Sequence, residues 1–221
     1  MTECFADRAD AGRQLAGALS DYAGRSDVVV LALPRGGVPV AYPVACALRA
    51  PLDVLVVRKL GVPCEPELAM GAIATGGAMH LQRSVIRSMG VTDAQLADVI
   101  VRETAELHRR EALYRGAAPP LPVDGRIVIV VDDGVATGAS MRAALQALRE
   151  RHPVRIVAAA PVAPAGAQHA FDGLADAFVA VSQPQPFFGI SQFYAHFGQT
   201  SDDEVRTLLD AARMQRGITS A

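Results

Sequence analysis

The chain has 221 residues and a formal net charge of −2, and hydrophobic residues make up 51% of it. This length predicts one domain, residues 1–221, with enough apolar side chains for a sizeable core. The slightly acidic balance argues against nucleic acid binding by bulk electrostatics, so we expect no nucleic acid partner. Because no apolar run reaches the length of a bilayer span, we also expect no membrane partner.

The start of the chain (MTECFADR) lacks a basic stretch followed by an apolar one, so we expect no signal peptide. Cys4, Cys46 and Cys64 are widely separated and show no metal-ligand spacing. We therefore expect reduced thiols and a cytoplasmic protein.

The first predicted elements are a helix over residues 7–22, from its apolar spacing, and a buried strand over residues 28–33. The helix is expected to pack on the sheet, and the sequence does not place Phe5 or Arg8 relative to any site. After the strand come Pro34, Arg35, Gly36 and Gly37, and then a helix-like stretch over residues 38–49. Two glycines after an arginine let backbone N–H groups approach a ligand at the sheet edge where open α/β folds bind ligands.

A second strand is predicted over residues 53–57, and it ends in the cations Arg58 and Lys59. At the same sheet edge these side chains would meet a ligand's negative charge, Arg through its fork geometry and Lys as a point charge. The alternative is a solvated pair of cations at a strand end. Residues 60–77 are rich in Gly and Pro, which predicts a mobile loop or a short hairpin rather than a core element.

A long helix is predicted next, because Thr92 and Gln95 have the spacing of a capping box and helical spacing continues to about Arg115. A plain surface helix is the default for this stretch, and a dimer contact or support for a lid are the alternatives. Further along, residues 155–160 and 177–181 predict strands with a short helix between them. Strands that alternate with helices predict an α/β fold with a doubly wound parallel sheet.

The stretch around which the rest is organised begins with a β-branched run, residues 127–131, which predicts a buried parallel strand. It is followed by Asp132, Asp133, Gly134, Val135, Ala136, Thr137, Gly138, Ala139 and Ser140, and then by a predicted helix over residues 141–150. Backbone N–H groups and two hydroxyls at a helix start form an anion site suited to a phosphate. The two carboxylates can accept hydrogen bonds from vicinal hydroxyls or hold the hydration shell of Mg²⁺.

These features together suit a sugar phosphate that lies between the acids and the amide-rich turn. One alternative is an α/β crossover whose acids only cap and solvate a turn. Another is a phosphatase-type acid pair, but that pattern separates its acids by one residue, whereas Asp132 and Asp133 are adjacent.

The segment from Val130 to Ser140 resembles the phosphoribosyl-pyrophosphate (PRPP) motif of type I phosphoribosyltransferases. The resemblance implies that Asp132 and Asp133 bind the ribose hydroxyls and that residues 136–140 wrap the 5′-phosphate. Arg35-Gly36-Gly37 resembles the pyrophosphate loop of that family, which often carries a non-proline cis peptide, here expected at Pro34–Arg35. Over most of the chain the sequence is similar to bacterial phosphoribosyltransferases of unassigned substrate.

The resemblance implies a transferase that moves the 5-phosphoribosyl group of PRPP to a small nitrogen acceptor and releases pyrophosphate. Asp132, Asp133, Arg35 and Lys59 would be its catalytic residues, and Mg²⁺, held through PRPP and water, its cofactor. The remaining substrate-binding residues would be Gly36, Gly37, Arg58, Gly134, Val135, Ala136, Thr137, Gly138, Ala139 and Ser140. A flexible loop within residues 60–77 would close over PRPP, and we expect a homodimer.

Residues 183–200 contain Phe187, Phe188, Phe193, Tyr194 and Phe197 among prolines and glycines. The family resemblance implies that this segment forms a small hood that grips the acceptor, although core packing also accounts for most aromatic side chains. Family members that act on 6-oxopurines carry an acid where this chain has Ala136, which counts against hypoxanthine or guanine. Gly134 stands where the family often has a larger aliphatic residue.

Two alternatives from other classes remain open. One is a PRPP- or nucleotide-sensing regulator that keeps the fold but does not turn over its ligand. The other is a nucleotide-binding scaffold without preference for PRPP.

Overall fold

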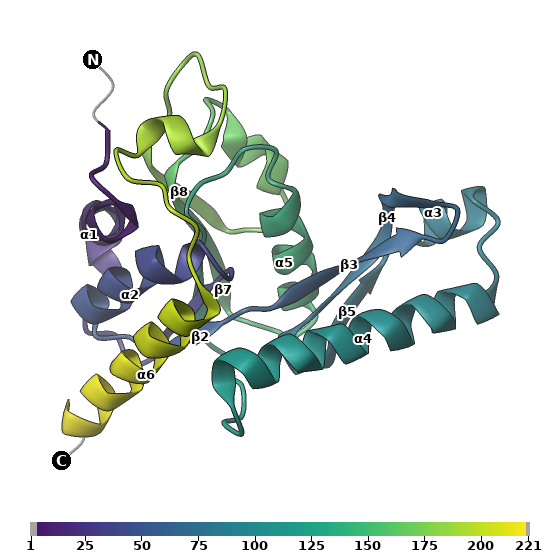
Figure 1. Cartoon of the computed structure of the whole chain (residues 1–221), viewed down its shortest axis with the longest axis horizontal. Coiled ribbons are helices and arrows are strands. Elements are labelled where there is room, and N and C mark those ends of the chain that lie inside the picture. The colour runs from purple at the N-terminus through teal and green to yellow at the C-terminus, as the bar shows by residue number, and fades with distance from the viewer. Residues whose placement is uncertain (1–3, 220–221) are drawn as a thin grey trace.

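The computed structural model describes residues 4–219, with the side chains of residues 4–215 (Figure 1). Its strands are β1 (Val28–Ala32), β2 (Leu52–Val54), β3 (Val57–Val62), β4 (Glu65–Ala74), β5 (Ala78–Leu81), β6 (Ile127–Val131), β7 (Arg155–Val162) and β8 (Ala177–Ser182). Its α-helices are α1 (Arg8–Ala18), α2 (Gly37–Leu48), α3 (Arg83–Ser88), α4 (Asp93–Arg115), α5 (Ala139–Arg149) and α6 (Asp202–Thr219). Short 3₁₀ helices are η1 (Ser20–Tyr22), η2 (Thr75–Gly77), η3 (Ala167–Phe171) and η4 (Ile190–Phe193).

The main sheet has five parallel strands in the order β2-β1-β6-β7-β8. The chain starts near the middle of this sheet and winds outward in both directions, so β1 and β6 are neighbours although the arm lies between them in sequence. Leu31 of β1 pairs with Val130 of β6, which sets the two strand ends side by side. The predicted doubly wound parallel α/β sheet is confirmed.

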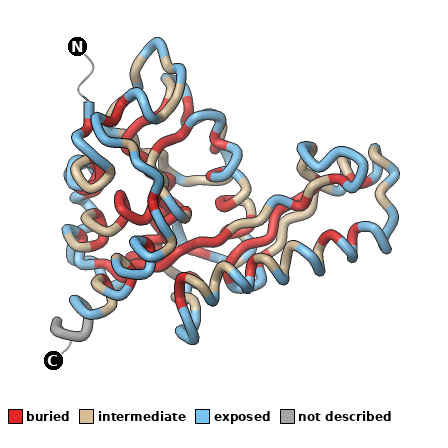
Figure 2. Tube along the Cα trace, in the orientation of Figure 1, coloured by how far each residue is buried: buried red, intermediate tan, exposed pale blue. Residues whose placement is uncertain are grey.

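Both faces of the main sheet are covered, which explains why its central strands are continuously apolar. Alternate residues such as Val29, Val128 and Val130 pack in the core that includes α5 and η3. Their neighbours along the strands, such as Val30 and Ile129, pack on the opposite face against α1, α2 and α6. The buried residues in Figure 2 are concentrated in these strands and in the helix faces turned toward them.

A second sheet forms an arm that projects from the main body (residues 57–115; Figure 1). Its three antiparallel strands are ordered β3-β4-β5, and α4 runs along β3 and β4. Thr92 caps α4: its hydroxyl accepts from Gln95 N while the Gln95 side chain accepts from Thr92 N. The predicted capping box is therefore confirmed, and α4 forms one side of the arm.

One prediction in this region is wrong and another is right only in part. Residues 53–57 are not one strand, because β2 ends at Val54 in the main sheet and Val57 already belongs to the arm sheet. For residues 60–77 the hairpin alternative is confirmed and the mobile loop is wrong, because most of these residues lie in β3 and β4, a long hairpin joined by a third strand, β5. Their glycines allow close strand contact, since a Cβ at Gly71 would lie 2.5 Å from the His80 carbonyl oxygen. Leu60 and Met70 are fully buried and belong to the same apolar core as residues of α1, α2 and α6, so these strands are core elements, contrary to the prediction.

The segment predicted as a hood, residues 183–200, lies beside the start of the chain (Figure 1). Phe5 N donates to Phe193 O, and Ala195 N and His196 N donate to the carbonyl oxygens of Phe5 and Ala6. Phe5, Phe193 and Tyr194 form a small apolar cluster between the two segments. The hood segment is thus held by backbone pairing with the first residues of the chain.

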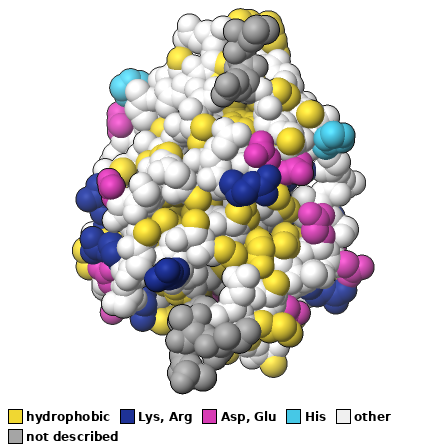
Figure 3. Space-filling view, turned by 90° about the vertical axis from the view of Figure 1, so that its left-hand side faces the viewer, with side chains coloured by type: hydrophobic (Ala, Val, Ile, Leu, Met, Phe, Trp, Pro, Cys, Tyr) yellow, Lys and Arg dark blue, Asp and Glu magenta, His cyan; other side chains and the backbone are white. Residues whose placement is uncertain are grey.

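The helix α6 follows the hood segment, and its buried residues Val205 and Leu209 pack against α2 and α4. Within the described residues, we find no helix with the length and apolar character needed to cross a membrane. On the face drawn in Figure 3, which includes α1 and α6, acidic and basic side chains are scattered among apolar ones.

Candidate functional site at the carboxyl edge of the main sheet

The two acids lie where the topology brings the ends of β1 and β6 together. Asp132 and Asp133 follow β6 directly, and Arg35, Gly36 and Gly37 follow β1. A Cβ built on Gly36 would lie 2.1 Å from Asp133 Oδ2, and one on Gly37 would lie 2.7 Å from Val131 O. The turn after β1 therefore touches the acid pair, and any side chain at Gly36 would displace the Asp133 carboxylate. The peptide between Pro34 and Arg35 is cis, as predicted.

Burial raises the pKa of both carboxyl groups of the acid pair. Loss of hydration raises the pKa of Asp132 well above its ordinary value, and the charge of Asp133 raises it further. Burial also raises the pKa of Asp133, while the Arg8 guanidinium opposes that rise. Asp132 Oδ1 accepts a hydrogen bond from Asp133 N at 2.9 Å, which fixes the orientation of the first acid. Desolvated acids of this kind gain most from a ligand that brings hydrogen-bond donors or a cation.

The loop after the acids forms a pocket of about 150 Å³ that is lined by residues 132–141 and Ile190. Gly138 precedes α5 with φ of 73°, a left-handed conformation that glycine adopts without strain. Thr137 Oγ1 accepts from Ala139 N at 3.4 Å, while Thr137, Ala139 and Ser140 are exposed. The pocket therefore combines the amino end of an 11-residue helix with exposed hydroxyls and N–H groups, as the sequence predicts for a phosphate site.

Arg8 is a site residue that the sequence did not identify. Its Nε and Nη2 atoms each lie 2.8 Å from Asp133 Oδ2, and its Nη1 donates to Gly198 O at 2.6 Å. The guanidinium also lies over the Phe197 ring, 3.9 Å from its centroid. Arg8 and Asp133 are 125 positions apart, so local spacing carried no signal of the pair. Tyr194 adds a second unforeseen contact, because its hydroxyl donates to Asp133 O at 2.6 Å.

Arg35 projects to the side of the acid pair where α4 and α6 meet. Its Nη1 lies 3.9 Å from Asp202 Oδ1, the same oxygen that accepts from the Tyr114 hydroxyl at 2.8 Å. Burial, followed by the bond to Asp202, raises the pKa of Tyr114 to about 12. A cavity of about 470 Å³ opens here, lined by Arg35, Leu113, residues 199–203 and Arg206. Arg35 thus borders an open space next to the turn that contacts the acids.

Arg58 and Lys59 lie in β3, so they are part of the arm and not of the main sheet edge. Arg58 Nη2 contacts Glu103 Oε2 at 2.6 Å, and Lys59 Nζ contacts Glu67 Oε2 at 3.2 Å. Both cations line a cavity of about 420 Å³ between the arm hairpin and α4 that includes none of residues 132–141. The structure therefore does not bring these two cations into the pocket of the acid pair.

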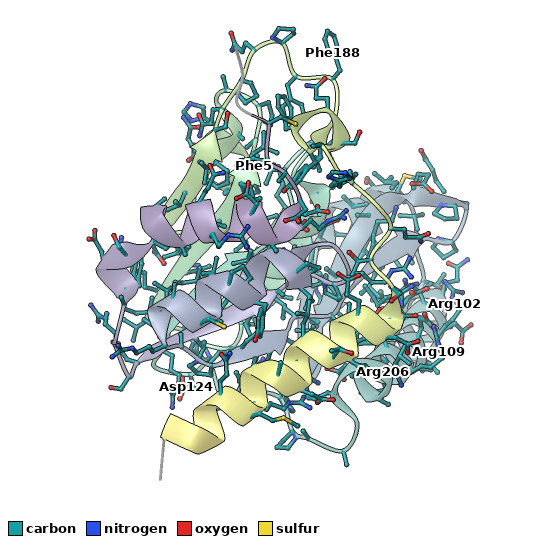
Figure 4. The ribbon with its side chains drawn as sticks, turned by 60° about the vertical axis from the view of Figure 1, so that its left-hand side comes forward. Phe5, Arg102, Arg109, Asp124, Phe188 and Arg206 are labelled. Atoms are coloured by element: carbon teal, nitrogen blue, oxygen red, sulfur yellow. The ribbon has the colours of Figure 1, made fainter. Side chains whose placement is uncertain are left out.

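The aromatic residues of the hood segment mostly pack on one another. Phe187 stacks on Phe193 with ring centroids 5.3 Å apart, and Tyr194 contacts both Phe5 and Phe197. Phe188 is 85% exposed and points away from the body at the tip of the segment (Figure 4). Ile190 reaches Gly134, where a Cβ would lie 2.6 Å from its Cγ2. The Ile190 side chain of the hood segment thus fills the space beside Gly134.

Across the described side chains, no group of three or more His, Cys, Asp and Glu residues is arranged to hold a metal ion. The acid pair nevertheless offers carboxylate oxygens, which are the ligands that Mg²⁺ prefers. Together, the site comprises a desolvated acid pair, a helix-start pocket suited to a phosphate, and a glycine turn in contact with the acids.

Comparison with known proteins identifies relatives that share most of this chain. A family model described as "Phosphoribosyl transferase domain" matches residues 6–179. Two Mycobacterium tuberculosis proteins, named "Putative phosphoribosyl transferase Rv0571c" (strain H37Rv) and "MT0597" (strain CDC 1551), are each 49% identical over 208 residues. Those residues are 94% of this chain but 47% of each relative, so the chain spans about half the length of these curated relatives. The crystal structure of TT1426 from Thermus thermophilus is 42% identical with a TM-score of 0.83, covering 93% of this chain and 97% of that one.

Proposed function

Because the chain belongs to the phosphoribosyl transferase domain family, we propose that it transfers the 5-phosphoribosyl group of PRPP to a nitrogen acceptor. The acceptor's lone pair forms a bond to ribose C1 while the C1–oxygen bond breaks, pyrophosphate leaves with the electron pair, and the nitrogen loses its proton. The observation that carries the proposal is the contact between two segments that are about one hundred positions apart. Gly36 touches Asp133 so closely that one ligand can meet the acids, the turn and the helix-start pocket together.

In this proposal the ribose hydroxyls donate to Asp132 and Asp133, and the 5′-phosphate accepts from the amides of residues 136–140. The leaving pyrophosphate lies against Gly36, Gly37 and Arg35. Mg²⁺ bound by PRPP would supply positive charge that stabilises the leaving group. The chain's own contribution is then mainly positioning and electrostatic stabilisation.

The acceptor is proposed to be something other than a 6-oxopurine. Ala136 is an exposed residue of the loop and has no carboxylate to contact such a base. Ile190 packs against Gly134 at the same pocket, so an apolar group from the hood segment borders the proposed ribose site. We further propose Lys59 and Arg58 as pyrophosphate ligands, which requires them to exchange Glu67 and Glu103 for the ligand, and a homodimeric, cytoplasmic enzyme.

A second candidate, a sensor of PRPP or nucleotides without turnover, is favoured by one observation. Arg58 and Lys59 are both paired with acids of the arm and do not face the acid pair's pocket. A sensor needs affinity for its ligand but no cations that stabilise a leaving group.

Calorimetric titration with PRPP, with and without Mg²⁺, tests the proposal. We expect Mg²⁺-dependent binding that Asp132→Asn weakens about tenfold or more, since a hydrogen bond to a charged group contributes about 1.5–3 kcal/mol. Asp132→Asn leaves the Arg8–Asp133 pair intact, and Asp133→Asn should weaken binding as well. Asp124→Asn is the matched control, because Asp124 is exposed and lies far from Phe5 and the hood in Figure 4. Equal affinity for the Asp132→Asn variant and the native chain would disprove the ribose-binding role.

A screen of nitrogen acceptors for pyrophosphate release then separates the candidates. Release with one acceptor supports the transferase. PRPP binding without release from a broad set supports the sensor, and comparable affinity for AMP and PRPP supports a nucleotide scaffold.

A further inference from the structure

We propose that Arg8 is a positioning residue for the phosphoribosyl site, where it fixes the Asp133 carboxylate and closes the hood segment over it. The identity of the ligand in this proposal rests on the function proposed above. The contacts that support Arg8 belong to the protein alone.

The first support is the geometry of the ion pair. Arg8 directs Nε and Nη2 at the same oxygen, Asp133 Oδ2, at 2.8 Å each. The two side chains are only 12% and 14% exposed, so the pair is largely shielded from water. A planar guanidinium that donates twice to one oxygen limits rotation of the carboxylate more than a point charge would.

The second support is what surrounds Asp133 on its other sides. Gly36 lies against Oδ2, and the Tyr194 hydroxyl holds the backbone carbonyl of Asp133 at 2.6 Å. Arg8 and the Gly36 backbone thus occupy the Oδ2 side of the carboxylate. This arrangement leaves Oδ1 as the oxygen that accepts a ribose hydroxyl, and Arg8 determines which oxygen plays that role.

The third support is the connection to the hood segment. The remaining Arg8 nitrogen, Nη1, donates to Gly198 O at 2.6 Å, and the guanidinium lies 3.9 Å from the Phe197 ring centroid. The residues just before Arg8 pair with the same segment, since Phe5 N donates to Phe193 O and His196 N donates to Ala6 O. One side chain therefore contacts an acid of the proposed ribose site and the segment proposed to grip the acceptor.

The inference also predicts a change in how Asp133 responds to pH when Arg8 is replaced. The charged or titratable groups that face Asp133 are Asp132 beside it, Arg8 from α1 and Tyr194 from the hood segment. Of these, Arg8 is the group that lowers the pKa of Asp133. Without Arg8 the pKa of Asp133 rises further. As the pH is lowered, Asp133 then takes up its proton at a higher pH than in the native chain, and the carboxylate that accepts a ribose hydroxyl is lost sooner.

The experiment compares Arg8→Gln and Arg8→Lys with the native chain and with Arg13→Gln. Arg13 lies on the same helix, is 63% exposed and pairs with Asp10 one turn away, so it is a matched control. Two measurements need no ligand: carboxyl ¹³C NMR titration of Asp133, and amide hydrogen exchange over residues 193–198. A third is calorimetric PRPP affinity as a function of pH.

For Arg8→Gln we expect a raised Asp133 titration midpoint, faster exchange in the hood segment and PRPP binding about tenfold weaker or more. The loss of affinity should begin at higher pH than in the native chain. Arg8→Lys keeps the positive charge but lacks the planar guanidinium with its several donors. Its Asp133 titration midpoint should therefore be close to native, whereas hydrogen exchange in the hood segment should stay faster than native. This variant also serves if Arg8→Gln fails to fold.

The inference would be wrong if Arg8→Gln kept the native titration midpoint of Asp133, the native hydrogen exchange of the hood segment and the native pH dependence of PRPP affinity. The proposed function would be unaffected by that result. A native chain that does not bind PRPP would disprove the proposed function instead. In that case the Asp133 titration and the hood exchange still decide whether Arg8 positions the acid and the hood.

Discussion

The main body and the arm organise their charged side chains in opposite ways. At the edge of the main sheet, Asp133 is surrounded by groups from three distant segments: Arg8, Gly36 and Tyr194. In the arm, the cations Arg58 and Lys59 pair with Glu103 and Glu67 of the arm itself. The body therefore presents a formed site to a ligand, whereas the arm's cations must change partners before they can bind one.

The two regions are joined by a buried ion pair, and breaking it should have the largest effect. Arg115 at the end of α4 donates to Asp53 Oδ1 at 3.0 Å and to Val54 O at 3.0 Å, and both charged side chains are under 10% exposed. Arg115→Met leaves the Asp53 carboxylate buried without its cation. We expect a loss of about 3–5 kcal/mol in the free energy of unfolding, measured by urea denaturation.

The double variant Arg115→Met with Asp53→Asn is the control for that prediction. It removes both charges and keeps an oxygen that can accept from the Val54 or Leu121 backbone N–H, so it should recover part of the lost stability. A loss below about 1 kcal/mol in the single variant would mean that water reaches the carboxylate, in contradiction of its burial.

Arg58→Gln tests whether the arm contributes to the site. If Arg58 leaves Glu103 to bind pyrophosphate, the variant should lose about 1.5–3 kcal/mol of PRPP affinity, roughly 10- to 100-fold. Affinity for ribose 5-phosphate, which lacks the pyrophosphate, should stay unchanged in calorimetry. Arg109→Gln is the control, since Arg109 lies on the exposed side of α4 and pairs with Glu106 (Figure 4). An unchanged PRPP affinity in Arg58→Gln would confine the site to the body and strengthen the sensor candidate.

Gly36→Ala tests whether the glycine turn of the main body holds the Asp133 carboxylate in place. The added methyl group would lie 2.1 Å from Asp133 Oδ2, so the carboxylate must move although Arg8 holds it. Overpacking of this kind costs about 1–3 kcal/mol, and we expect a loss of PRPP affinity of about that size. In Gly17→Ala, the control on α1, no atom outside the glycine's chain neighbours and its own helix backbone lies within 4 Å of the new Cβ, and affinity should not change. Native affinity in Gly36→Ala would show that the turn does not constrain the acid.

Sequence alone predicted the parts of this comparison that depend on short segments. The β-branched strand, the two acids and the glycine-containing turn before α5 follow one another within about 20 residues, so local pattern identifies them. Adjacent parallel strands then bring the Arg35–Gly37 turn to the same edge, as the order of strands implies. The main sheet was predicted correctly for this reason.

The arm and Arg8 could not be predicted in the same way. Gly61 and Gly71 favoured a mobile loop or a short hairpin outside the core, yet they lie in long paired strands where a side chain would collide with a neighbouring backbone. Tertiary packing overrode their low strand propensity. Arg8 lies at the site because Phe5 and Ala6 pair with residues 193–196, a contact between segments up to 190 positions apart in the sequence. No spacing rule records contacts of that range.

The smallest expected effect tests whether the far end of the arm is independent of the body. Thr92 caps α4 through its bond from Gln95 N, so Thr92→Ala should cost about 1 kcal/mol and speed hydrogen exchange in the first turn of α4. PRPP affinity should remain native, because the acid pair and its neighbours are held by contacts within the body. Thr207→Ala is the control: Thr207 lies within α6 and its hydroxyl donates to Asp203 O, so no cap is lost. If PRPP affinity falls together with the cap, arm and body act as one unit, and the pairing of Arg58 with Glu103 becomes part of the binding equilibrium.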